Sequence, residues 1–261
     1  MAFFAGSFLS LTVWRRANVM SDANSILRDF AEAYMRRRYS VLFYALLFTM
    51  VAAPLLSALE LSGTLFESLV AASLLAATIP ADRMKGRPLL LVLMIIAWLA
   101  RPFTVWLGHT VLSAMTLGIW TLIGMLAAAA ALRFAMGATK VDGEHLYAAL
   151  SAYLLAGICF GLLYWVLEQS RSGSFAVSGQ FSQTSAIYFS FVTLATLGYG
   201  DIAPRAEIAR GLAIVEGVGG QLFLAVLVAR LVSLYSSPRT NQIDGHRSIG
   251  LRKESDGSSL P

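Results

Sequence analysis

The chain has 261 residues, of which 57% are hydrophobic and only 13% are charged, and its formal net charge is +5. A soluble domain carries about 25% charged residues, so this composition excludes an ordinary soluble protein and indicates an integral membrane protein. In such a chain the placement of basic residues is more informative than their sum, so the positive charge gives no reason to expect nucleic-acid binding. The single cysteine, Cys159, excludes a disulfide within one chain and is expected to be a small buried residue.

Residues 1–39 precede the first long apolar stretch and are expected to be cytoplasmic. The chain starts with apolar residues, and Arg15 and Arg16 follow them, which is the reverse of the order in a secretory signal. We therefore expect no cleaved signal. Residues 21–38 mix apolar and charged positions and are predicted to form an amphipathic helix at the membrane surface, with a solvated helical leader as the alternative.

Six stretches are predicted to cross the bilayer as helices, which takes about 20 mostly apolar residues each. They are 40–58, 62–80, 88–106, 110–136, 145–168 and 206–235. Basic residues gather before the first stretch, between the second and third, near the turn into the fifth and after the sixth, as in cytoplasmic loops. Both termini are therefore expected to be cytoplasmic, in a protein of the plasma (inner) membrane that contacts the lipid bilayer.

The first four stretches form a predicted four-helix transmembrane region, 40–137, without a voltage sensor. Residues 110–132 contain no Arg or Lys, and Arg133 stands alone at the cytoplasmic end of the fourth stretch. The membrane potential acts on charge with about 2.3 kcal/mol per elementary charge per 100 mV. A stretch with one basic residue at its end gives this field little to act on.

The apolar pattern is interrupted between the fifth and sixth stretches. Residues 183–195 suit a helix of about 20 Å, which is too short to cross a membrane. The sequence TLATLGYGD, Thr193 to Asp201, overlaps its end. Non-helical backbone at membrane depth is tolerated only where protein buries it or where it lines a water-filled cavity. We therefore expect a re-entrant half-helix and then an extended segment along a water-filled axis.

Backbone carbonyls on this extended segment are suited to replace the hydration shell of a cation. Gly198 and Gly200 reach conformations that L-residues avoid, which lets successive carbonyls point the same way. The carbonyls concerned belong to Thr196, Leu197, Gly198 and Tyr199. Four copies around an axis would stack rings of oxygen suited to K⁺. The half-helix would point its C-terminal, negative end toward the same axis.

The stretch TLATLGYGD resembles the potassium-channel signature TxxTxGYGD, with Leu197 where valine is commonest. The resemblance covers about residues 145–236 and implies an outer helix, a pore helix, a selectivity filter and an inner helix within a pore domain, 138–236. It implies a homotetramer that conducts K⁺ passively as the permeant ion, with no enzyme activity, no cofactor and no small-molecule substrate. Some family members carry a carboxylate where this chain has Val192, so behaviour that depends on that group is not expected here. The expected fold class is an all-α integral membrane protein with six transmembrane helices and a re-entrant pore helix and filter loop between the fifth and sixth.

Several side chains beside the predicted filter are expected to support it. The ring of Tyr199 is expected to pack against the pore helix near Tyr188 and Phe189, with a membrane-interface tyrosine as the alternative. Thr193 belongs to the signature and precedes the filter. Asp201 lies at the outer mouth, where it is expected either to attract cations or to accept a hydrogen bond from Tyr188.

The sixth stretch contains a carboxylate and three nearby glycines. Each glycine inside a helix lowers helix stability by about 1 kcal/mol relative to alanine, which suggests a functional or packing reason for it. Gly217, Gly219 and Gly220 are therefore gating-hinge candidates. The resemblance places the hinge near Gly219 or Gly220, and close packing against the fifth stretch is the alternative. Glu216 is an intramembrane carboxylate, expected to face water or a partner and to lie behind the filter.

Residues 237–261 are rich in Ser, Arg, Asp and Gly and are predicted to be a disordered cytoplasmic tail. Two alternatives to a K⁺-selective channel remain open from the sequence. One is a poorly selective cation channel of the same architecture. The other is a transporter or accessory membrane subunit with a degenerate pore loop, although transporters usually show broken helices in both halves and this chain shows one break.

Overall fold

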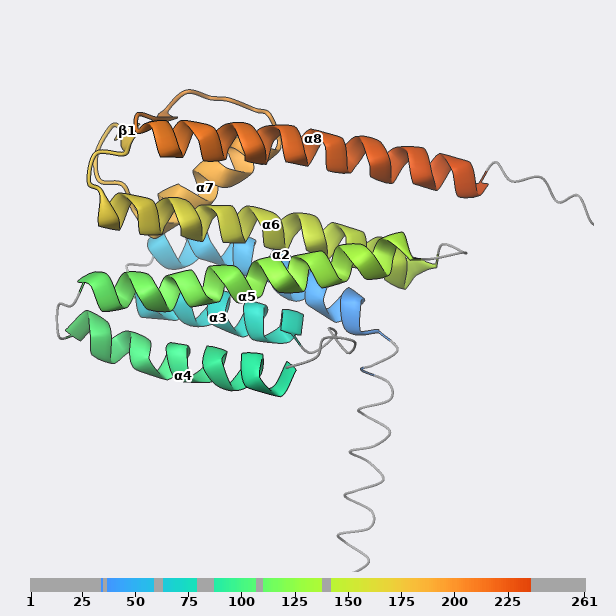
Figure 1. The fold of residues 1–261 in the computed structure, drawn as a ribbon, viewed down its shortest axis with the longest axis horizontal. Helices are drawn as coiled ribbons and strands as arrows, with labels where there is room; N and C mark the ends of the chain where they lie inside the picture. The colour runs from blue at the N-terminus through green and yellow to red at the C-terminus, as the bar shows by residue number, and fades with distance from the viewer. Residues whose placement is uncertain are drawn as a thin grey trace, which may run out of the picture. The chain divides into compact units, whose positions relative to one another are not determined.

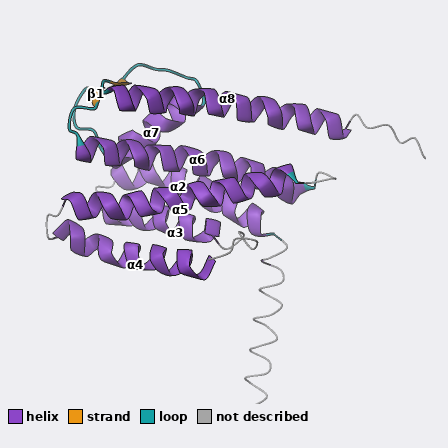
Figure 2. Cartoon of the chain, in the orientation of Figure 1, coloured by secondary structure: helices purple, strands orange, loops and turns teal. Residues whose placement is uncertain are grey.

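The computed structural model describes Tyr34 and residues 37–58, 63–78, 87–106, 110–137 and 142–235. The predicted amphipathic helix at 21–38 falls almost wholly outside these residues, and the tail 237–261 falls outside them completely. The described chain is almost entirely helical, with two short strands (Figure 2). It divides into two units, residues 1–222 and 223–261, and the packing described below lies within the first.

Each of the six predicted stretches lies on a helix. The helices are α2 (Arg38–Ala58), α3 (Gly63–Thr78), α4 (Arg87–Trp106), α5 (Thr110–Met136), α6 (Gly143–Ser170), α7 (Gln183–Leu194) and α8 (Glu207–Tyr235). The strands are β1 (Phe175–Val177) and β2 (Ile202–Pro204). The prediction of a mainly helical chain is therefore confirmed.

Three described helices are long and apolar enough to cross a membrane: Leu112–Met136, Gly143–Ser170 and Glu207–Ser233. Shorter apolar stretches lie on α2, α3 and α4. The 16 residues of α3 reach about 24 Å at 1.5 Å per residue, which is less than the hydrocarbon thickness of about 30 Å. Six crossings therefore remain a prediction.

The upstream helices pack mainly through apolar side chains. The axis of α5 runs along α6, while α3 and α4 pack on α5 and α2 contacts α3 and α6 (Figure 1). Gly124 permits the close approach of three helices, because a Cβ there would lie 2.5 Å from the Cys159 sulfur on α6 and 2.9 Å from Leu74 on α3. Cys159 is fully buried at this point, as predicted.

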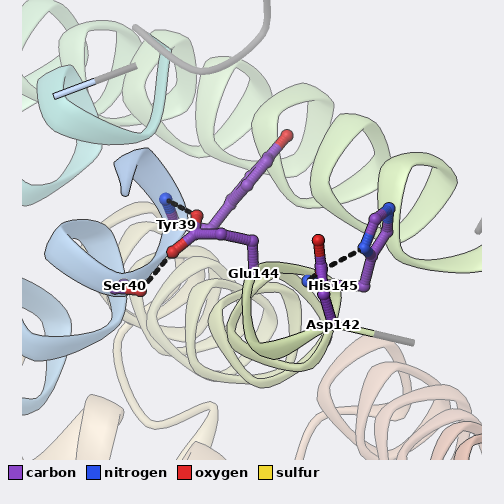
Figure 3. Close-up of polar contacts among 5 residues, drawn as sticks. All are labelled: Tyr39, Ser40, Asp142, Glu144 and His145. Atoms are coloured by element: carbon purple, nitrogen blue, oxygen red, sulfur yellow. Dashed lines mark hydrogen bonds and ion pairs between the residues drawn. The ribbon is translucent and has the colours of Figure 1, made fainter. Parts of the chain in front are cut away.

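Polar contacts join α2 to the start of α6 at one end of the bundle (Figure 3). The Glu144 carboxylate accepts hydrogen bonds from the Tyr39 N–H, at 3.0 Å, and from the Ser40 hydroxyl. It thereby caps the first turn of α2, where unpaired N–H groups and the helix dipole favour a negative charge. Asp142 caps α6 itself, accepting from the His145 N–H at 3.1 Å. The Glu144 contacts therefore join the start of α2 to the start of α6, whereas the Asp142 cap is local to α6.

Candidate functional site

Helix α7 is the short helix that the sequence predicts between the fifth and sixth stretches. Its 12 residues extend over about 18 Å, so it is too short to cross a bilayer. Ser182 caps its N-terminus by accepting from the Ser185 N–H at 3.1 Å. The helix ends at Leu194, so the C-terminal, negative end of its dipole faces the Gly-rich segment Thr196–Asp201 that follows.

Two glycines on α6 allow α7 to lie directly against it. A Cβ at Gly161 would lie 2.6 Å from the Ile187 Cα, and one at Gly157 would lie 2.5 Å from the Phe191 ring. Because Ile187 and Phe191 are one helical turn apart, as are the two glycines, the contact runs along both helices. These residues were not among the predicted site residues. The signal was present in the four-residue spacing of the glycines, which is typical of close helix contacts in membranes.

The backbone of the Gly-rich segment alternates in handedness. The φ angle is +56° at Thr196, +58° at Gly198 and +80° at Gly200. Among the described residues, Thr196 is the only non-glycine with a positive φ. This region favours glycine and costs an L-residue about 1–2 kcal/mol. A positive φ at every second residue rotates the successive peptide units. Neighbouring carbonyls then do not point to opposite sides in turn, as they do in a β-strand.

Two large side chains of the Gly-rich segment are exposed in the single chain. Tyr199 is 67% exposed and Leu197 is 56% exposed. The described residues show no ring contact between Tyr199 and Phe189. Phe189 instead packs against Tyr164 and Phe175 in a buried aromatic cluster, with ring centroids 5.1 and 5.4 Å away. Within the chain, Phe189 therefore supports α7 from the side of α6.

A two-stranded ribbon links the segments before α7 and after the Gly-rich segment. Strand β1 pairs antiparallel with β2, with Phe175 opposite Pro204 and Val177 opposite Ile202. These strands were not predicted, because three-residue strands carry too little periodicity to be recognised. The ribbon holds both ends of α7 and the Gly-rich segment.

Side chains brace the same ribbon from both neighbouring helices. The Glu168 carboxylate, near the end of α6, accepts from the N–H of Gly173 at 2.7 Å and of Phe175 at 3.2 Å. The Arg210 guanidinium, in the first turn of α8, donates to the Pro204 carbonyl at 3.3 Å. The segment before α7 and the segment after the Gly-rich segment are thus both anchored to neighbouring helices.

Asp201 ends the Gly-rich segment beside Tyr188 of α7. The Asp201 carboxylate beside the Tyr188 hydroxyl raises the pKa of Tyr188, mainly because it favours the protonated hydroxyl that can donate to it. Both expected roles for Asp201, attraction of cations and acceptance of a hydrogen bond from Tyr188, stay predictions, and its place beside Tyr188 is compatible with the second.

The first part of α8 contacts α7 through one face. Glu216 is 1% exposed and accepts from the Tyr164 hydroxyl at 2.6 Å. A Cβ at Gly220 would lie 2.8 Å from Leu194 Cδ1 and 2.9 Å from the Leu194 carbonyl oxygen. A Cβ at Gly217 would lie 3.7 Å from the Thr193 carbonyl oxygen, whereas one at Gly219 would have nothing within 4 Å. Close packing of Gly220 is therefore with α7, and not with the fifth stretch as the sequence analysis considered.

Comparison with known proteins finds similarities in this region of the chain. Residues 149–237 match the ion channel family. The inward rectifier potassium channel Kirbac3.1 of Paramagnetospirillum magnetotacticum is 32% identical over 101 residues, which are 37% of this chain and 32% of that protein. The two-pore potassium channel 4 of Arabidopsis thaliana is 43% identical over 94 residues, which are 36% of this chain and 31% of that protein.

Protein LctB of Bacillus caldotenax is 27% identical over 100 residues, 36% of this chain and 74% of that protein. The match thus spans about a third of the length of the two potassium channels. No solved structure matches the chain. The region that carries α7 and the Gly-rich segment thus matches the ion channel family and is similar to parts of these potassium channels.

Proposed function

We propose that four copies of this chain form a K⁺-selective channel in which the carbonyls of Thr196, Leu197, Gly198 and Tyr199 line the selectivity filter. The observation that carries this proposal is the positive φ at every second residue of the Gly-rich segment. Such a backbone can present a column of carbonyl oxygens on one side, and rings of such oxygens replace the hydration shell of K⁺. In this proposal α7 is a re-entrant pore helix, α6 the outer helix and α8 the inner helix.

The exposure of apolar surface supports assembly from several copies. Only 17% of the most apolar window of α8 is buried in one protomer. Leu197 and Tyr199 follow a helix too short to span, and they are mostly exposed. One Gly-rich segment per chain also cannot surround an ion, so the carbonyl rings need further copies. A homotetramer places the exposed side of each segment toward its neighbours and leaves the carbonyls for the axis.

A flux assay with the full-length protein in liposomes tests the proposal. K⁺-loaded vesicles should release K⁺ along its gradient, and Na⁺-loaded vesicles should release far less Na⁺. Equal fluxes of the two ions would instead favour the poorly selective cation channel. Absence of both fluxes from an intact tetramer would favour the accessory subunit.

Cross-linking in mild detergent tests the assembly separately. We expect a ladder of products that ends at four chains. A preparation that conducts K⁺ while it cross-links only to a dimer would contradict the tetramer and leave the channel activity standing.

A further inference from the structure

Glu216 is a carboxyl group buried between three helices. It lies on α8 and contacts hydroxyl groups from α6 and α7: its Oε2 is 2.6 Å from the Tyr164 oxygen and its Oε1 is 2.5 Å from the Ser190 oxygen. Among the described residues, no Lys, Arg or His forms an ion pair with it. An isolated buried carboxylate costs several kcal/mol unless a cation or enough hydrogen-bond donors compensate it.

The donors around Glu216 are too few for an ionised carboxylate. The Ser190 oxygen also lies 2.6 Å from the Gly157 carbonyl oxygen. A serine hydroxyl carries one hydrogen, and both a carbonyl and a carboxylate can only accept. With an ionised Glu216, one of the two contacts of Ser190 therefore brings two oxygens together without a hydrogen between them.

A neutral carboxylic acid satisfies every contact. Its own proton then points to the Ser190 oxygen, the Ser190 proton points to the Gly157 carbonyl, and the Tyr164 proton points to the other oxygen of Glu216. Three contacts use three hydrogens. Among the described residues, Tyr153 on α6 also interacts electrostatically with Glu216, but a tyrosine is uncharged at neutral pH and offers no compensating positive charge.

We propose that Glu216 is held as a neutral acid that donates a hydrogen bond to Ser190 and so fastens α7 to α8, which makes it a positioning residue for the Gly-rich segment. The contact has a second level, because Gly220 lies one turn after Glu216 and packs on Leu194, one turn after Ser190. Leu194 is the last residue of α7. The hydrogen bond between Glu216 and Ser190 therefore fixes the position of α7 along α8. It thereby fixes where the Gly-rich segment begins.

Glu216→Gln distinguishes the two states of the carboxyl group. An amide accepts at its oxygen, as Tyr164 requires, and donates from its nitrogen, as a neutral acid donates to Ser190. We expect this variant to keep the unfolding temperature and K⁺ flux of the wild type. Glu216→Leu, of similar size but without polar atoms, should lose about tenfold in flux, because it leaves the Tyr164 hydroxyl buried without a partner. If Gln is as damaging as Leu, Glu216 acts as an ionised acceptor and the proposal is wrong.

Infrared spectroscopy of the reconstituted protein at neutral pH reads the chemical state directly. We expect the carbonyl stretch of a protonated carboxylic acid in the wild type, its loss in Glu216→Gln, and a shift of the same band in Ser190→Ala. Absence of the band from the wild type would overturn the proposal. The effect on flux rests on the proposed channel function, but the infrared band does not. A protein that conducts no ions but shows the band would contradict the proposed function and still support the neutral state of Glu216.

Discussion

The upstream helices α2–α5 and the region from α6 to the first part of α8 are both apolar and helical, but they are held together in different ways. The upstream helices meet mainly through apolar side chains, with the buried hydroxyl pair of Thr49 and Ser73 as a local exception. The second region adds directed contacts: the β1–β2 ribbon and the hydroxyl groups around Glu216. Apolar packing is tolerant of small shifts, whereas hydrogen bonds fix positions within tenths of an ångström. The comparison indicates that the second region needs a defined geometry, as a row of ion-coordinating carbonyls would.

The sharpest test of this difference is Gly198→Ala. The methyl group would occupy a backbone position with φ of +58°, at about 1–2 kcal/mol per chain, or about 4–8 kcal/mol if four copies add. We expect K⁺ flux to vanish or to lose its preference over Na⁺ while the tetramer still forms. Leu197→Val is the control, since it keeps the carbonyl and most of the apolar bulk. Unchanged selectivity in Gly198→Ala would show that this segment is not the filter.

Gly161→Ala should show how tightly α7 packs against α6. The new methyl group would meet the Ile187 Cα, a backbone atom that cannot rotate away, so we expect a loss of about 1–3 kcal/mol of stability. Gly118→Ala on α5 is the matched control, because a Cβ there meets nothing within 4 Å, and the helix should gain about 0.5–1 kcal/mol. Denaturant unfolding in detergent compares the two. Equal stabilities would show that α7 does not depend on this close contact.

The two hinge candidates at the end of the α7 contact should differ. Gly220→Ala would press on Leu194 and should cost about 1–3 kcal/mol, because the Leu194 carbonyl oxygen, 2.9 Å from the new Cβ, is a backbone atom that cannot rotate away. Gly219→Ala has free space in one protomer and should keep its stability. A flux defect in Gly219→Ala without a stability defect would assign the hinge to Gly219. Matching defects in both variants would contradict the difference in packing.

The helix cap at the junction of the two regions should have a smaller effect. Asp142→Ala removes the N-cap of α6 and should cost about 1 kcal/mol at neutral pH. Hydrogen bonds from His145 lower the pKa of Asp142 from its usual 3.8. The stabilisation should therefore be complete above about pH 4 and disappear as the pH falls through this lowered pKa, so that wild type and variant converge in acid. A difference that persists at acid pH would show that the carboxylate charge is not its source.

The smallest expected effect is that of voltage on the upstream region. The described helix α5 carries a single basic residue, Arg133, in its last turn. Since each charge that crosses the field contributes about 2.3 kcal/mol per 100 mV, open probability should change little over the physiological range. Recording in planar bilayers measures it. Steep activation, equivalent to several charges per channel, would show that a voltage sensor was missed.

Composition and local pattern were sufficient to predict the helices and the short helix before the Gly-rich segment. Apolar runs longer than about 18 residues and glycines spaced by two leave few alternatives in a lipid environment. The signature also pointed to Gly198 and Gly200. The structure ends α7 at Leu194, one residue before the predicted end at Ala195.

Only the tertiary structure decided which side chains meet. Thr196 adopts a positive φ although it is not a glycine, which the sequence does not indicate. Glu216 contacts Tyr164 and Ser190, which lie 52 and 26 residues away in the chain on other helices. Phe189 joins the aromatic cluster with Tyr164 and Phe175 because α7 packs on α6. Sequence periodicity reports the faces of single helices, whereas these contacts depend on how helices distant in the chain are placed against one another.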